Sequence, residues 1–150
     1  MEKRYRYYIA YGSNLNKEQM AMRCPDAEPV FPVMLENKKL VFRSNCKGHG
    51  VATVEPEKGS RVPAMVWSIS DTDEKALDKY EGFPFLYRKE GVWLSIADGS
   101  VSTQAMMYVM NPGHEETTPS DAYYKTIEQG YRDFGLDVRT LELFAKKGVH

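Results

Sequence analysis

The chain has 150 residues, 42% of them hydrophobic and 27% charged, and a formal net charge of -1. This size and composition predict a single globular domain over 1–150 with enough length to bury a core. The near-zero charge excludes an overall basic surface for nucleic acid, and no apolar run is long enough to span a bilayer. The N-terminal segment has no apolar signal region, so we expect a cytoplasmic protein.

The first predicted elements are a strand and a short helix. Residues 4–11 alternate in the two-residue period of a strand, with tyrosine or isoleucine at every second position from Tyr5. Gly12-Ser13-Asn14 follows as a turn, and Gly12 lets the chain bend sharply or lets a ligand approach the backbone. Residues 17–23 are expected to form a helix capped by Asn14 or Asn16, and Asn16 with Gln19 has capping-box spacing.

Four short strands are predicted next along the chain. They are apolar runs separated by polar segments that carry Gly, Pro or Asn. The strands cover 30–35, 40–43, 51–54 and 62–69, with breaks at 36–39, 45–50 and 55–59.

The second half is expected to contain three helices and one hairpin. Asp71 and Glu74 have capping-box spacing at the start of a helix that ends near Glu81-Gly82. The strands 87–96 and 101–110 flank an Asp-Gly turn at 97–100. The last two helices are expected to start at 118–120, with Pro119 near the first helical position, and at Asp137.

Short strands joined by hairpin-length turns favour an α+β fold over a doubly wound parallel sheet. The expected sheet is mixed or antiparallel and curls into a small β-barrel with flanking helices.

The stretch from Tyr8 to Leu15 is the first candidate site. A strand that enters a helix through a turn of small residues leaves backbone N–H groups free, and such groups bind anions. The same residues also make an ordinary turn, so this reading stays open. The chain has neither a G-x-G-x-x-G nor a P-loop sequence, so a nucleotide site is poorly supported.

Cysteine and histidine are scarce, with two and three residues respectively. Cys24 and Cys46 do not have zinc-ligand spacing and are expected to be reduced thiols. The histidines are too few and too scattered for a triad or a His-rich metal site. Acid–base chemistry would therefore fall to a carboxylate, with no metal.

Glu81 is the candidate carboxylate. It sits at a helix end, and Tyr80, Phe83 and Phe85 around it would raise its pKa by excluding water. The alternative is that Glu81 is an ordinary solvated residue at the end of a helix.

Taken together, several motifs of the chain resemble those of the γ-glutamylcyclotransferase-like family. The Lys79-Tyr80-Glu81-Gly82 sequence is more similar to its bacterial and plant members, in the AIG2-like branch that includes γ-glutamylamine cyclotransferases. The matching motifs occur in the family's order over nearly the whole chain: Tyr11-Gly12-Ser13-Asn14-Leu15, Gly50 to Trp67, Leu77 to Gly82, Pro119-Ser120-x-x-Tyr123 and Gly130.

The resemblance implies an enzyme that converts a γ-glutamyl compound to 5-oxoproline and a free amine without a cofactor. It assigns general acid–base catalysis to Glu81 and binding of the small-molecule substrate to Tyr11, Gly12, Ser13, Asn14, Leu15, Tyr87 and Tyr123. The leaving amine could be an amino acid, the ε-amine of lysine, an alkylamine or Cys-Gly. Two other readings remain, a binding module for a small carboxylate, and a structural protein in which Glu81 pairs with Arg88 or Lys89. The chain could be a monomer or a homodimer.

Overall fold

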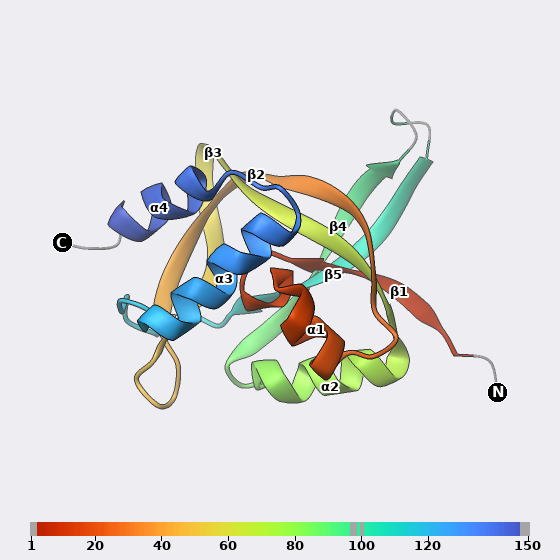
Figure 1. The fold of residues 1–150 in the computed structure, drawn as a ribbon, viewed down its shortest axis with the longest axis horizontal. Helices are drawn as coiled ribbons and strands as arrows, with labels where there is room; N and C mark the ends of the chain where they lie inside the picture. Colours follow the sequence, from red (N-terminus) through yellow and green to blue (C-terminus); the bar gives the residue numbers. More distant parts are fainter. Residues whose placement is uncertain (1–2, 97–98, 100, 148–150) are drawn as a thin grey trace.

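The computed structural model describes residues 3–96, 99 and 101–147. A mixed five-stranded sheet forms its centre, and four α-helices pack around it (Figure 1). In chain order the elements are β1 (Tyr5–Ala10), the 3₁₀ turn η1 (Ser13–Leu15), α1 (Lys17–Arg23), β2 (Glu28–Ser44), β3 (Gly50–Ser70), α2 (Asp71–Glu81), β4 (Tyr87–Ile96), β5 (Val101–Met110), α3 (Asp121–Asp133) and α4 (Val138–Lys147).

The sheet has the order β2-β3-β1-β5-β4. All neighbours are antiparallel except β1 and β5, which run parallel, so the predicted mixed sheet and α+β class are confirmed. The sheet is not closed, because β2 and β4 stand at its two ends in the part of the chain that the structure describes. The expected barrel is therefore not confirmed.

β1 is a central strand, and this position changes its burial pattern. Tyr8, Ile9 and Ala10 are all buried, although strict alternation would expose one face. A central strand covered on both faces buries consecutive residues. The Gly12-Ser13-Asn14 turn therefore follows directly from a strand in the middle of the core.

The four strands expected between residues 30 and 69 are two long ones. β2 and β3 pair from Glu28 with Ser68 to Ser44 with Gly50, and a single register shift between Glu36 and Lys38 lies where the breaks at 36–39 and 55–59 were expected. Asn37 takes a left-handed conformation with φ of 58°, and its side chain accepts a hydrogen bond from Gly59 N–H at 3.0 Å. Asparagine tolerates this conformation, so the strands bulge where the sequence suggested that they end.

Two of the predicted helix starts need correction. The N-cap of α2 is Ser70, whose capping box uses Asp73, not Asp71 with Glu74. The N-cap of α3 is Ser120, so Pro119 lies before the cap instead of at the first helical position. By contrast, α1 has the predicted bounds, and Asn16 caps it through Gln19 N–H at 2.9 Å.

α1 and α3 lie beside the turn that follows β1, whereas α4 lies farther out, next to β2 and α3 (Figure 1). α3 packs on η1 and on α4, while α1 packs on α2. The predicted hairpin strands β4 and β5 are confirmed, and their connecting turn at 97–100 lies largely outside the described residues. None of the described helices is long and apolar enough to cross a membrane.

Candidate active site

A cavity of about 200 Å³ opens where the end of β1 meets α2, β3, β4, β5 and α3. It brings together most of the predicted site residues, which lie far apart in the sequence. Those lining it are Tyr11, Gly12, Ser13, Asn14, Glu81, Tyr87 and Tyr123. Glu81 is the one charged residue among the described residues that line the cavity.

Leu15 is the predicted site residue that the cavity does not include. Its side chain is fully buried, and it lies against Gly130 of α3. A Cβ atom on Gly130 would lie 2.6 Å from the Cβ atom of Leu15. Leu15 thus packs against α3, and the absence of a side chain at Gly130 allows α3 to approach Leu15 closely.

The Gly12-Ser13-Asn14 turn holds two backbone hydrogen bonds. Leu15 N–H donates to Gly12 O at 3.0 Å, and Asn16 N–H donates to Ser13 O at 3.1 Å. The first two N–H groups of the turn, those of Ser13 and Asn14, do not act as donors in this pattern of hydrogen bonds. Both residues line the cavity, so these N–H groups are suited to an anionic ligand.

Glu81 is the last residue of α2, and the left-handed Gly82 ends the helix behind it. Burial raises the pKa of Glu81 to about 7, while the positive charge of Arg23 acts in the opposite direction. Its Oε1 lies 3.4 Å from Nδ2 of Asn14, in the turn after β1. Glu81 is partly buried, which agrees with the prediction of a partly desolvated carboxylate and not with a fully solvated one.

The groups that surround Glu81 differ from those expected. Phe85 is 86% exposed and shields nothing, and Phe83 packs edge-on against Tyr108. The walls of the cavity are instead tyrosines from several elements: Tyr8, Tyr11, Tyr80, Tyr87, Tyr108 and Tyr123. The sequence showed ten tyrosines but no local sign that they converge.

Tyr87 and Tyr123 both bind the backbone of one residue of β3, Ala52. The hydroxyl of Tyr87 donates to Ala52 O at 2.6 Å, while the hydroxyl of Tyr123 accepts from Ala52 N–H at 3.0 Å. Burial raises the pKa of both phenols, so both are uncharged at neutral pH. Tyr87 can then accept a further hydrogen bond, and the proton of Tyr123 is directed away from Ala52.

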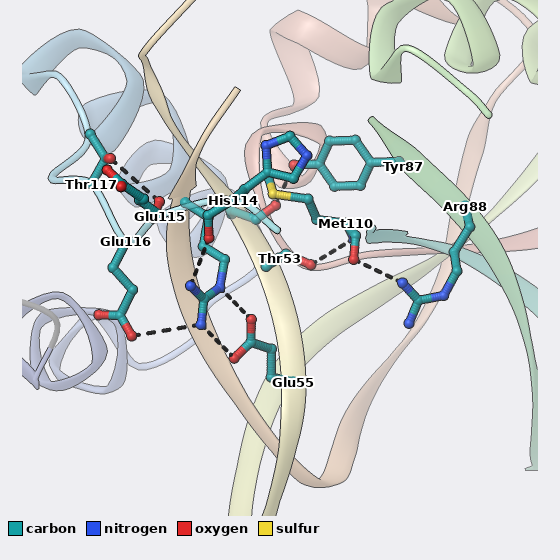
Figure 2. Close-up of polar contacts among 11 residues, drawn as sticks. Thr53, Glu55, Tyr87, Arg88, Met110, His114, Glu115, Glu116 and Thr117 are labelled. Carbon is teal, nitrogen blue, oxygen red and sulfur yellow. Dashed lines mark hydrogen bonds and ion pairs between the residues drawn. The ribbon is translucent and has the colours of Figure 1, made fainter. Parts of the chain in front are cut away.

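The segment before α3 is tied to the β2–β3 pair by polar contacts (Figure 2). Arg43 donates to His114 O at 2.9 Å and to Glu55 at 3.1 Å, and its guanidinium lies 3.8 Å from Glu116. Thr117 N–H donates to Phe42 O at 3.1 Å. These contacts hold the chain against β2 just before α3, the helix that carries Tyr123, begins.

The cations that a structural role would pair with Glu81 have other partners. Lys89 lies 2.7 Å from Glu74 and 2.9 Å from Asp78, and Arg88 lies 3.0 Å from Glu90. Glu81 is therefore left facing the cavity, as a catalytic or binding role requires.

The two cysteines take no part in the cavity. Cys24 is buried at the end of α1, where burial raises the pKa of its thiol to about 12, and Cys46 is exposed. Among residues 3–96, 99 and 101–147, no three His, Cys, Asp or Glu side chains form a group that could hold a metal ion.

Comparison with known proteins supports the motif resemblance. Residues 8–130 match the model of the family described as gamma-glutamyl cyclotransferase, AIG2-like. This chain belongs to the gamma-glutamylcyclotransferase family. The matched range runs from the strand before the turn to Gly130, so it includes every lining residue discussed above.

Named relatives of this family cover most of the chain. It is 33% identical to a gamma-glutamylcyclotransferase of Bos taurus over 86% of this chain and 71% of the relative. It is 31% identical to the Homo sapiens gamma-glutamylcyclotransferase over 90% of this chain and 74% of the relative. A solved gamma-glutamyl cyclotransferase superposes with a TM-score of 0.81 at 27% identity, covering 94% of this chain and 86% of that one. The present chain is therefore a gamma-glutamylcyclotransferase-like enzyme.

Proposed function

We propose that this protein releases 5-oxoproline and a free amine from a small γ-glutamyl amide, with Glu81 as general acid and base. The observation that carries this proposal is the position of Glu81, a carboxylate with a pKa near 7 inside a tyrosine-lined cavity. A base is most effective when its pKa lies near the working pH.

The substrate supplies its own nucleophile. The α-amine attacks the γ-carbonyl carbon, a C–N bond closes the five-membered ring, and the bond to the leaving nitrogen breaks. Because the reaction is intramolecular, a cavity that holds the substrate folded gains a large proximity effect.

At neutral pH the α-nitrogen of the substrate is an ammonium and loses two protons in all, one before it attacks and one as the ring amide forms. Glu81 takes these protons in turn and passes them to the leaving nitrogen, which departs as an ammonium, so the carboxylate is regenerated after each turnover. Water is not consumed, and the two products together contain all atoms of the substrate. The steps use no metal or organic cofactor.

The remaining groups of the cavity would orient the substrate. The N–H groups of Ser13 and Asn14 and the hydroxyl of Tyr123 are donors that fit the α-carboxylate or the developing oxyanion. Tyr87 donates to Ala52 O and is therefore suited to accept a hydrogen bond from the substrate amine. Leaving amines from amino acids, lysine, alkylamines and Cys-Gly are all compatible with the chemistry.

The test is a mass-spectrometric assay for 5-oxoproline. The panel contains γ-glutamyl dipeptides, γ-glutamyl-ε-lysine, γ-glutamyl alkylamines and glutathione, each with the wild type and with Glu81→Gln. Product from the wild type alone would support the reaction and its base, and the best substrate would identify the leaving amine. If no substrate reacts while 5-oxoproline or L-glutamate still raises the melting temperature, the protein is a binding module.

A further inference from the structure

The side chain of Asn14 connects three neighbours inside the site. Its Nδ2 donates to the hydroxyl of Tyr8 at 2.9 Å and lies 3.4 Å from Oε1 of Glu81. Its Oδ1 accepts a hydrogen bond from Nη1 of Arg23. Asn14 is only 3% exposed, so its amide has little chance to exchange these partners for water.

Arg23 determines which way this amide points. A guanidinium has five N–H donors and no acceptor, so only the oxygen of the Asn14 amide can face it. The NH₂ group must then face Tyr8 and Glu81. With the amide reversed, its oxygen would lie beside the Glu81 carboxylate and its NH₂ group beside the arginine, and both contacts would be repulsive.

Arg23 is itself held from two sides. Its Nη2 donates to Oε1 of Gln19, one turn earlier on α1, at 2.9 Å. The centre of its guanidinium lies 3.5 Å from the centroid of the Tyr80 ring, and Tyr80 directly precedes Glu81 on α2. Stacking on an aromatic face suits the planar guanidinium and would not suit a lysine equally well. Arg23 therefore joins α1 to the end of α2 that carries Glu81.

We propose that Arg23 is a positioning residue, which fixes the Asn14 amide and through it the hydrogen bond from Asn14 to Glu81. The proposal rests on the role of Glu81 in the proposed function. Arg23 does not line the cavity and touches no substrate, so it acts through Asn14.

Arg23 also supplies a positive charge that partly offsets the effect of burial on the pKa of Glu81. The titratable groups around this carboxylate are Tyr80 on the same helix, α2, and, from the other elements, Tyr8 and Tyr11 at β1, Tyr87 on β4, Tyr108 on β5 and Tyr123 on α3. Desolvation raises the pKa of Tyr8, Tyr11, Tyr87 and Tyr123, so these four carry no charge at neutral pH. Removing Arg23 should therefore raise the pKa of Glu81, because none of the described residues that line the cavity carries a positive charge.

The direct test compares Arg23→Gln with Arg139→Gln. Arg139 contacts only Asp137 among the described acidic residues and has an 84% exposed side chain, so its variant controls for the loss of one positive charge. For Arg23→Gln we expect the acid limb of kcat/KM to move up by about one pH unit, a tenfold loss below both inflections. Arg139→Gln should keep the wild-type profile.

A second measurement works without turnover. In protein labelled with ¹³C at glutamate Cδ, the Glu81 signal is identified by its absence in Glu81→Gln, and its pH titration is followed by NMR. The titration should shift upward in Arg23→Gln, and Arg23→Lys, which keeps the charge, should lie between the two. If the wild type makes no 5-oxoproline, the proposed function fails, and this titration still decides the role of Arg23.

A double-mutant cycle shows whether Arg23 acts through Asn14. Coupled residues give non-additive losses. On the alkaline plateau, where a shifted pKa of Glu81 has no effect, kcat in the Arg23→Gln/Asn14→Ala protein should therefore be close to that of Asn14→Ala alone. Multiplying losses, or an unchanged Glu81 titration in Arg23→Gln, would overturn the proposal. Circular dichroism confirms that each variant is folded, and Arg23→Lys replaces Arg23→Gln in the cycle if the latter is not.

Discussion

The hydroxyl of Tyr123 accepts a hydrogen bond from the backbone N–H of Ala52 over 3.0 Å. Tyr87 donates to the carbonyl of the same residue over 2.6 Å. One residue of β3 therefore orients two phenols from α3 and β4. Toward a ligand, the Tyr87 hydroxyl can accept a hydrogen bond and the Tyr123 hydroxyl can donate one. This arrangement connects the stability of the site with its binding function.

Tyr123→Phe should reduce both stability and binding. The variant leaves the buried N–H of Ala52 without its acceptor, which costs about 1–3 kcal/mol of unfolding free energy. It also removes a donor from the cavity, so 5-oxoproline should raise the melting temperature less than in the wild type. The check is thermal unfolding with and without the ligand, with Tyr124→Phe on the same helix as control. An undiminished ligand effect would mean that Tyr123 is only a packing residue.

Glu81→Gln should abolish turnover and retain the fold. General acid–base catalysis contributes about 10²–10⁴-fold to a rate, so kcat should fall by that order. The rate of 5-oxoproline formation is the measurement, and the exposed Glu18→Gln is the matched control. In the wild type, kcat/KM should rise with pH through about 7, where Glu81 loses its proton. A rate that is the same in Glu81→Gln would remove Glu81 from the mechanism.

The same substitution should make the protein more stable at alkaline pH. The pKa of Glu81 is about 7 in the folded state, against 4.5 for an ordinary glutamate side chain. The folded state therefore binds more protons between these values, and wild-type stability falls as pH rises through this window. The difference of 2.5 units corresponds to as much as about 3 kcal/mol above pH 7.

Chemical denaturation of the wild type and Glu81→Gln at pH 4 and pH 8 measures this effect. The two proteins should have similar stability at pH 4, and Glu81→Gln should be the more stable at pH 8. If the two proteins differed in stability by the same amount at pH 4 and at pH 8, the effect would arise from packing and not from ionisation.

Gly130→Ala should destabilise the protein and weaken the site. The added Cβ would lie 2.6 Å from Leu15 Cβ and 2.7 Å from the backbone nitrogen of Asn16, so α3 and the turn must separate. Overpacking of this kind costs about 1–3 kcal/mol, although alanine favours helix elsewhere. Lys125→Ala, at an exposed position of α3, is the control and should leave the melting temperature nearly unchanged. If Gly130→Ala proves as stable as that control, the close approach of α3 is not required.

Local patterns in the sequence predicted much of the fold. α1, β4 and β5 have the predicted bounds. Both candidate stretches, Tyr11–Leu15 and Glu81, contribute residues to the lining of one cavity. Such features depend on residues close together in the chain, where period, caps and turn residues act. The same patterns divided β2 and β3 into four strands, because a bulge at Asn37 and a chain break carry similar local signals.

The chemistry of the site depended on contacts that no local pattern contains. The scarcity of histidine in the sequence favoured a carboxylate for any acid–base chemistry, and the family motifs pointed to Glu81. Only the tertiary structure decided that tyrosines desolvate Glu81, that Ala52 orients Tyr87 and Tyr123, and that Arg23 reaches Asn14. The desolvation of Glu81 and the direction of the hydrogen bonds around it depend on residues from different elements. They are therefore fixed only when the sheet brings β1, β3, β4 and the helices together.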